Sequence, residues 1–161
     1  MKGSSGARLM DREESAAYAA GIHAAGRTVV FTNGVFDLLH PGHVRYLREA
    51  ASLGDILIVG LNTDVSVRRN KGKGRPITPE LERAEMVGAL DCVSAVTLFD
   101  EDTPARIILA VQPDVLVKGA DWPGDQIVGR DTVEARGGRV VRIAVEQGYS
   151  TSALLNKIRA R

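Results

Sequence analysis

Apolar residues along this chain fall into two kinds of run, which alternate from one end to the other. Short and nearly continuous apolar runs, rich in β-branched residues, predict strands that are covered on both faces. There are five of them, at 28–33, 55–62, 92–99, 114–119 and 139–145. Between them, apolar residues recur at helical spacing, which predicts helices at 12–26, 41–54, 78–90, 103–112, 129–138 and 150–161.

Residues at the ends of these segments support the helix assignments. Gly26 is a glycine stop for the first helix, and Pro41 fits the first turn of the second. Thr78, with Pro79 after it and Glu80 in the first turn, predicts an N-cap for the helix at 78–90.

The alternation predicts an α/β fold with a doubly wound, five-stranded parallel sheet in a single domain. We assign residues 27–161 to this domain and 1–26 to an N-terminal tail and helix, with a frayed Gly/Ser start. Such sheets bind ligands beyond the carboxyl ends of their strands. The loops to inspect are therefore 33–43, 62–77, 118–125 and 146–151.

Composition narrows the class of protein. The 161 residues are 44% hydrophobic, which suits a globular fold with its own core. A formal net charge of +1 gives no general attraction to nucleic acid or membrane, and Cys92, the one cysteine, has no internal disulfide partner. No apolar run reaches the ~18 residues of a membrane span, and the start lacks the apolar core of a signal peptide. We expect a cytoplasmic protein that binds neither nucleic acid nor membrane.

The loop at 33–43 places two of the chain's three histidines at the start of a helix. Gly34 permits close approach of a ligand to the backbone, and helix N-termini attract anions. His40 and His43 are therefore expected to donate hydrogen bonds to an anion, the alternative being a helix cap and a surface histidine. A metal site is not indicated, because two histidines need a third ligand and Asp37 is the one nearby candidate.

Two further loops carry groups that suit phosphate. The loop at 62–77 contains two glycines and five cations, Arg68, Arg69, Lys71, Lys73 and Arg75. They favour a mobile cationic flap over phosphates, the alternative being a solvated basic loop. The hydroxyl residues 150–152 open the last helix. Taken alone they form an ordinary N-cap, although the N-terminus of a helix is also a place where an anion can bind.

At this point a family resemblance becomes visible. "GVFDLLHPGH" (34–43) resembles the GxFDxxHxGH signature of the nucleotidyltransferase superfamily with the HxGH motif. "GDILIVGLNTDVSVRRNKGKGRPI", "RAEMVGALDCV", "DVLVKGADW" and "GYSTSALLNKI" are similar to its heptose-1-phosphate adenylyltransferase branch, the ADP-heptose synthases, so that the resemblance covers roughly residues 27–160. It implies a Rossmann-like fold. It also implies transfer of AMP from ATP to D-glycero-D-manno-heptose 1-phosphate, which releases pyrophosphate and gives ADP-heptose for lipopolysaccharide core or related glycan synthesis.

The resemblance also implies roles for individual residues. The catalytic group is His40, His43 and Lys71. The nucleotide-binding group is Asn33, Gly34, Phe36, Asp37, Lys73, Arg83, Tyr149, Ser150 and Thr151. The acceptor-binding group is Asp64, Lys118, Asp121 and Trp122. We expect Mg²⁺ to arrive on the phosphates of ATP, with Asp37 as the carboxylate within reach, and we expect a homo-oligomer, either a dimer or a tetramer.

Two other functions stay open at this point. One is a cytidylyltransferase acting on an alditol or amino-alcohol phosphate. Val145 and Glu146 stand where those enzymes carry an Arg-Thr or Arg-Ser pair, and Asp91 stands where they carry an arginine, so both positions argue against it. The other is a non-catalytic nucleotide-binding module, against which the intact histidine pair and the STS segment argue.

Overall fold

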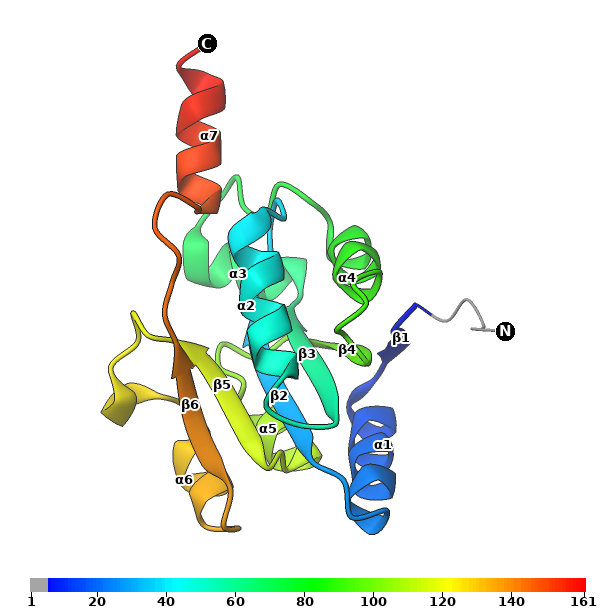
Figure 1. The fold of residues 1–161 in the computed structure, drawn as a ribbon. Helices are drawn as coiled ribbons and strands as arrows, with labels where there is room; N and C mark the ends of the chain where they lie inside the picture. Colours follow the sequence, from blue (N-terminus) through cyan, green and yellow to red (C-terminus); the bar gives the residue numbers. More distant parts are fainter. Residues whose placement is uncertain (1–5) are drawn as a thin grey trace.

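The computed structural model describes residues 6–161 and confirms an α/β fold built on one parallel sheet (Figure 1). The sheet has the strand order β1-β4-β3-β2-β5-β6, and every neighbouring pair is parallel. The six strands are β1 (Arg8–Met10), β2 (Val29–Gly34), β3 (Ile56–Asn62), β4 (Ala95–Phe99), β5 (Val115–Gly119) and β6 (Arg139–Ile143).

The sheet has one strand more than the sequence predicts, because β1 lies in the segment that we assigned to a tail and helix. It pairs with β4 in the register Leu9↔Val96 and forms the edge of the sheet. A three-residue strand is too short for a period to be visible, and Leu9 is half exposed, so the apolar pattern does not reveal it. The Gly/Ser start, residues 1–5, lies outside the described residues.

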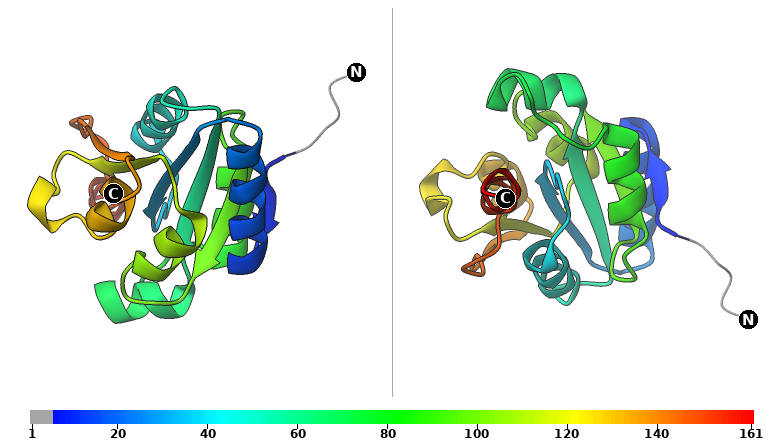
Figure 2. Two further views of the ribbon diagram at one scale, coloured as in Figure 1. Left: turned by 90° about the horizontal axis from the view of Figure 1, so that it is seen from below. Right: turned by 90° about the horizontal axis from the view of Figure 1, so that it is seen from above.

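Helices cover both faces of the sheet, as a doubly wound fold requires (Figure 2). One apolar core includes Leu47 of α2 and Val87 of α4, and the other includes Ala19 of α1 and Ile107 of α5. The helices are α1 (Arg12–Ala24), α2 (Pro41–Ala51), α3 (Asp64–Lys71), α4 (Glu80–Gly88), α5 (Ala105–Val111), α6 (Arg130–Glu134) and α7 (Thr151–Arg159), with a 3₁₀ turn, η1 (Gly124–Gln126).

The segment at 62–77 is not wholly the loop that we predicted, because its first half is the helix α3. The Thr63 hydroxyl caps this helix by accepting a hydrogen bond from Ser66 N at 3.2 Å, and Gly72 ends it. Asp64 in its first turn and the basic residues in its last turn suit the helix dipole. The flap proper is therefore the shorter segment 72–78.

The predicted N-cap at Thr78 is also wrong. α4 begins at Glu80 after Pro79 and has no side-chain cap. The backbone N–H of Thr78 donates instead to Asp37 Oδ1 at 3.0 Å, so this residue is tied to the loop after β2.

The carboxyl ends of the strands and the start of α7 lie at the same end of the molecule (Figure 1). α7 projects beyond the sheet, and none of its residues is buried. Within residues 6–161, no helix combines the length and apolar character needed to cross a bilayer.

Candidate active site

The main cavity lies where the winding of the sheet reverses direction, between the carboxyl ends of β2 and β5. From β2 the chain proceeds through β3 to β4 on one side, and β5 and β6 lie on the other. Such a switch point leaves a crevice above the sheet. The cavity has a volume of about 470 Å³, and its lining comes from all four loops that the sequence marked for inspection.

The histidine pair forms one wall of this cavity. The imidazole rings of His40 and His43 are stacked, with centroids 3.7 Å apart and planes 18° from parallel. His40 Nδ1 accepts from His43 N, and His43 Nδ1 accepts from His40 N, each at 3.4 Å, so the pair caps α2 reciprocally. With both Nδ1 atoms acting as acceptors, the neutral rings carry their protons on Nε2, which leaves two N–H donors for a ligand.

Both histidines are held neutral near pH 7. Burial lowers the pKa of His40, and burial together with the neighbouring His40 lowers the pKa of His43 to about 4, although the Asp37 carboxylate acts in the opposite direction. The pair therefore offers hydrogen bonds to an anion without a formal charge.

The loop between β2 and the histidines is strained. Phe36 and Leu38 both have φ of 51°, a conformation that residues other than glycine rarely adopt. The Phe36 ring is buried and lies 5.3 Å from the His43 ring. Between these two residues, Asp37 turns into the protein, where its carboxylate accepts hydrogen bonds from Ile77 N, Thr78 N and Arg75 Nε.

Of the five cations in the predicted flap, two line the cavity, Lys71 at the end of α3 and Arg75 beyond it. Lys73, predicted to bind nucleotide, is exposed and does not line the cavity.

The start of α7 faces the same space. Ser150, Thr151 and Ser152 line the cavity, and the Ser150 hydroxyl accepts from Ala153 N at 2.9 Å as the N-cap. The Thr151 hydroxyl donates to the carbonyl oxygen of Asp37 at 2.6 Å. The structure thus joins the first and last loops at one point.

Three of the four residues predicted for the acceptor, Lys118, Asp121 and Trp122, line the cavity. Lys118 lies at the end of β5 with its Nζ 5.6 Å from the centre of the Trp122 ring. Burial lowers the pKa of Lys118 to about 8, and the Asp121 carboxylate opposes this shift. Asn33, at the end of the adjacent β2, has a buried Oδ1 with no hydrogen-bond partner among residues 6–161.

Two predicted site residues lie away from the cavity wall and bind each other. Arg83 is fully buried and donates from Nη2 to Asp64 Oδ1 at 2.8 Å. Its Nη1 donates to Val35 O and its Nε to Thr78 O. Arg83 therefore cross-links the first loop, α3 and the end of the flap, and direct contact of either residue with a ligand stays a prediction.

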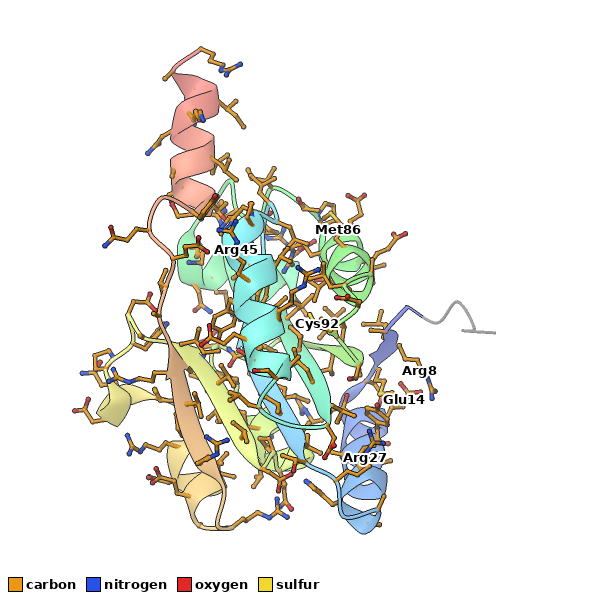
Figure 3. All side chains as sticks on the ribbon, viewed as in Figure 1. Arg8, Glu14, Arg27, Arg45, Met86 and Cys92 are labelled. Atoms are coloured by element: carbon orange, nitrogen blue, oxygen red, sulfur yellow. The ribbon has the colours of Figure 1, made fainter. Side chains whose placement is uncertain are left out.

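The sequence reasoning missed one face of α2. The cavity is also lined by Arg45, Tyr46 and Glu49. They follow Gly42 by three, four and seven residues, and this helical spacing could have placed them on the same face of the helix. Arg45 is labelled on α2 in Figure 3. It forms an ion pair with Glu146 of the last loop and lies 5.4 Å from the centre of the Tyr149 ring. Glu146 and Tyr149 are thus held against α2.

The site contains no ready-made metal centre. No group of three or more histidine, cysteine or acidic side chains that could hold a metal ion occurs within residues 6–161. Both oxygens of Asp37 already accept protein donors.

Comparison with known proteins identifies relatives of this chain. A family model described as cytidylyltransferase-like matches residues 31–155. A "Bifunctional protein HldE" from Citrifermentans bemidjiense is 59% identical over 136 residues, 84% of this chain and 28% of that protein. Another from Geotalea uraniireducens is 50% identical over 155 residues, 96% of this chain and 32% of that protein. The chain thus spans about a third of the length of these relatives.

Solved structures show the same fold. A lipopolysaccharide core biosynthesis protein from Thermoplasma volcanium has 33% identity and a TM-score of 0.63, covering 78% of this chain and all of that one. Pantoate-beta-alanine ligase from Francisella tularensis has a TM-score of 0.64 over 96% of this chain and 78% of its own, at 11% identity, which is a likeness of fold alone.

Proposed function

Because this chain belongs to the cytidylyltransferase-like family of nucleotidyltransferases, we propose that its cavity transfers AMP from ATP to a sugar 1-phosphate. The acceptor is D-glycero-D-manno-heptose 1-phosphate. One of its phosphate oxygens bonds to the α-phosphorus of ATP, the bond from that phosphorus to the bridging oxygen breaks, and pyrophosphate leaves. The product is ADP-heptose, a precursor for lipopolysaccharide core or related glycans.

One observation carries the proposal. The histidine pair, Lys71 and the first residues of α7 come from three distant parts of the chain, yet they line one cavity at the switch point of the sheet. Neutral donors, a cation and a helix N-terminus are the groups that bind a polyphosphate.

The histidines suit the α-phosphate. Their Nε2 protons are available once both Nδ1 atoms accept from the backbone. In the transition state, negative charge gathers on the non-bridging oxygens of the α-phosphate, and preorganised donors stabilise it. The acceptor oxygen is already anionic at neutral pH, so no general base is required, and catalysis consists of positioning and charge stabilisation.

Lys71 and the start of α7 suit the departing pyrophosphate. Lys71 supplies positive charge from the end of α3, while Ser150 and Thr151 supply a hydroxyl-bearing helix N-terminus. Mg²⁺ would be bound by ATP phosphates, where it supplies further charge neutralisation.

Lys118, Asp121 and Trp122 suit the sugar phosphate. Together they give a cation, a carboxylate that can accept from sugar hydroxyls and an aromatic surface, at the end of the cavity formed by β5. The identity of 50–59% to the HldE relatives and the likeness to the Thermoplasma lipopolysaccharide core biosynthesis protein support a substrate of lipopolysaccharide synthesis.

A pyrophosphate-release assay tests the proposal directly. ATP and CTP are each combined with heptose 1-phosphate, glycerol 3-phosphate and ethanolamine phosphate, and the nucleotide product is identified by mass. We expect release with ATP and heptose 1-phosphate. Preference for CTP with an alditol or amino-alcohol phosphate would replace adenylyl by cytidylyl transfer, and no release with any pair would leave a nucleotide-binding module.

A further inference from the structure

Asp37 lies where three segments of the chain meet. It belongs to the loop after β2, and its side chain is fully buried. Its Oδ2 accepts from Ile77 N at 2.8 Å and from Arg75 Nε at 3.0 Å, and its Oδ1 accepts from Thr78 N at 3.0 Å. Burial alone would raise the pKa of this carboxyl, but the three donors outweigh it and hold the pKa below its ordinary value. The ionised carboxylate thus fixes the end of the flap.

The contact with Arg75 also orients a cation. The Arg75 side chain is one-fifth exposed, lines the cavity and is held through Nε. Its two terminal nitrogens have no hydrogen-bond partner in the part of the chain that the structure describes. A guanidinium anchored through Nε presents those terminal N–H groups in a fixed fork, which suits phosphate oxygens.

The backbone of Asp37 fixes the third segment. Its carbonyl oxygen accepts the Thr151 hydroxyl at 2.6 Å, at the first residue of α7. Since α7 has no buried residue, packing does little to hold its start in place. This hydrogen bond is therefore a main link between the helix N-terminus and the histidine loop.

We propose that Asp37 is a positioning residue that anchors both the Arg75 guanidinium and the start of α7 around the phosphates, and that it is not a metal ligand. The inference rests on the proposed function for the identity of the phosphates. Arg75 would then be a catalytic residue that contacts the polyphosphate, and Asp37 would act through it.

Hydrogen exchange tests the anchor without any substrate. Asp37→Asn exchanges one carboxylate oxygen for an amide donor, so it cannot accept both backbone N–H groups. The remaining oxygen can still accept from one of them, so we expect the amide of Ile77 or Thr78, or both, to exchange at least ~10-fold faster, as measured by NMR. Asp114→Asn is the matched control, because Asp114 accepts from Val29 N at 2.8 Å and from His23, away from the cavity. Both of these contacts use Asp114 Oδ2, which the oxygen of an asparagine can replace, so this variant should leave the exchange of the Ile77 and Thr78 amides unchanged.

Unchanged exchange at Ile77 and Thr78 in Asp37→Asn, or equal acceleration by both variants, would overturn the anchor. Because this experiment needs neither ATP nor acceptor, it stands apart from the proposed reaction. If Asp37→Asn fails to fold, Arg75→Ala keeps the test open: kcat/KM for pyrophosphate release should fall ~10-fold or more while Ile77 and Thr78 stay protected. Wild-type activity in Arg75→Ala would contradict the proposal.

A double-mutant cycle tests whether Asp37 acts through Arg75. If it does, Asp37→Asn combined with Arg75→Ala should lose at most ~3-fold more kcat/KM than the more damaging single variant. Losses that multiply would refute that link. The half-saturating Mg²⁺ concentration in Asp37→Asn should stay within ~2-fold of wild type, whereas a ~10-fold rise would show a metal ligand.

Discussion

His40 and His43 each combine helix capping with the ability to donate a hydrogen bond to a ligand. Each caps the helix through Nδ1, and each keeps its Nε2 proton for a ligand. From the sequence, helix capping was the alternative to anion binding. In the structure both Nδ1 atoms do cap the helix, and this fixes the tautomer that anion binding needs.

The lowered pKa of His43 makes stability depend on pH. Its pKa is about 4 when folded and its ordinary value is 6.5. Between these values the unfolded chain binds a proton that the folded chain does not, so the free energy of unfolding falls as the pH is lowered through this window. We expect His43→Gln to lose less stability than wild type between pH 7 and 4.5 in urea unfolding. Parallel curves for the two proteins would refute the neutral, partly buried state of this ring.

The lowered pKa of Lys118 predicts that acceptor binding depends on pH. With its pKa lowered to about 8, this amine loses its charge as the pH rises from 7.5 to 9. If Lys118 binds the acceptor phosphate as proposed, KM for the sugar 1-phosphate should rise over that range, because this cation is lost. Lys118→Arg, which stays charged, should remove the rise, and KM for ATP serves as the control. An identical rise in Lys118→Arg would exclude Lys118 as its source.

Among the secondary-structure elements, the sequence missed those whose signals are short. β1 has three residues and no visible period. The sequence of α3 has a threonine N-cap, an acidic residue in the first turn and a glycine at its end. We nevertheless predicted a loop there, because the segment contains many cations. Thr78 looked like a cap, but tertiary contacts with Asp37 and Arg83 take its backbone groups. The last helix begins as its sequence predicts, with Ser150 as the N-cap.

Substitution of Arg83 should mainly lower stability, whereas substitution of Lys71 should mainly lower activity. Arg83→Ala leaves Asp64 and two carbonyl oxygens without their buried partner, so we expect a loss of about 3 kcal/mol in the free energy of unfolding. Lys71→Ala at the exposed end of α3 should change stability by no more than ~0.5 kcal/mol while lowering kcat/KM. Denaturant unfolding and pyrophosphate release measure the two effects. A stable Arg83→Ala would contradict the cross-link.

For the molecule as a whole, the apolar runs predicted the fold and the positions of the loops predicted where the cavity lies. The alternation of strands and helices indicated the doubly wound sheet, and the switch-point rule then located the cavity. Contacts between distant segments were out of reach, because Asp37–Thr78 and Arg45–Glu146 join residues that no local pattern relates. The burial of Arg83 was likewise invisible, since an arginine on a helix reads as a surface residue.

The turnover of His43→Ala with ATP and heptose 1-phosphate tests the proposed chemistry most directly. Losing one preorganised donor to the developing charge should lower kcat for pyrophosphate release by about 10²–10³-fold. The dissociation constant for ATP should stay within ~3-fold, because the proposed site also binds the phosphates through Lys71, Arg75 and the start of α7, which this substitution leaves intact. If kcat stays within ~3-fold of wild type, the histidine pair does not stabilise the transition state and the mechanism is wrong.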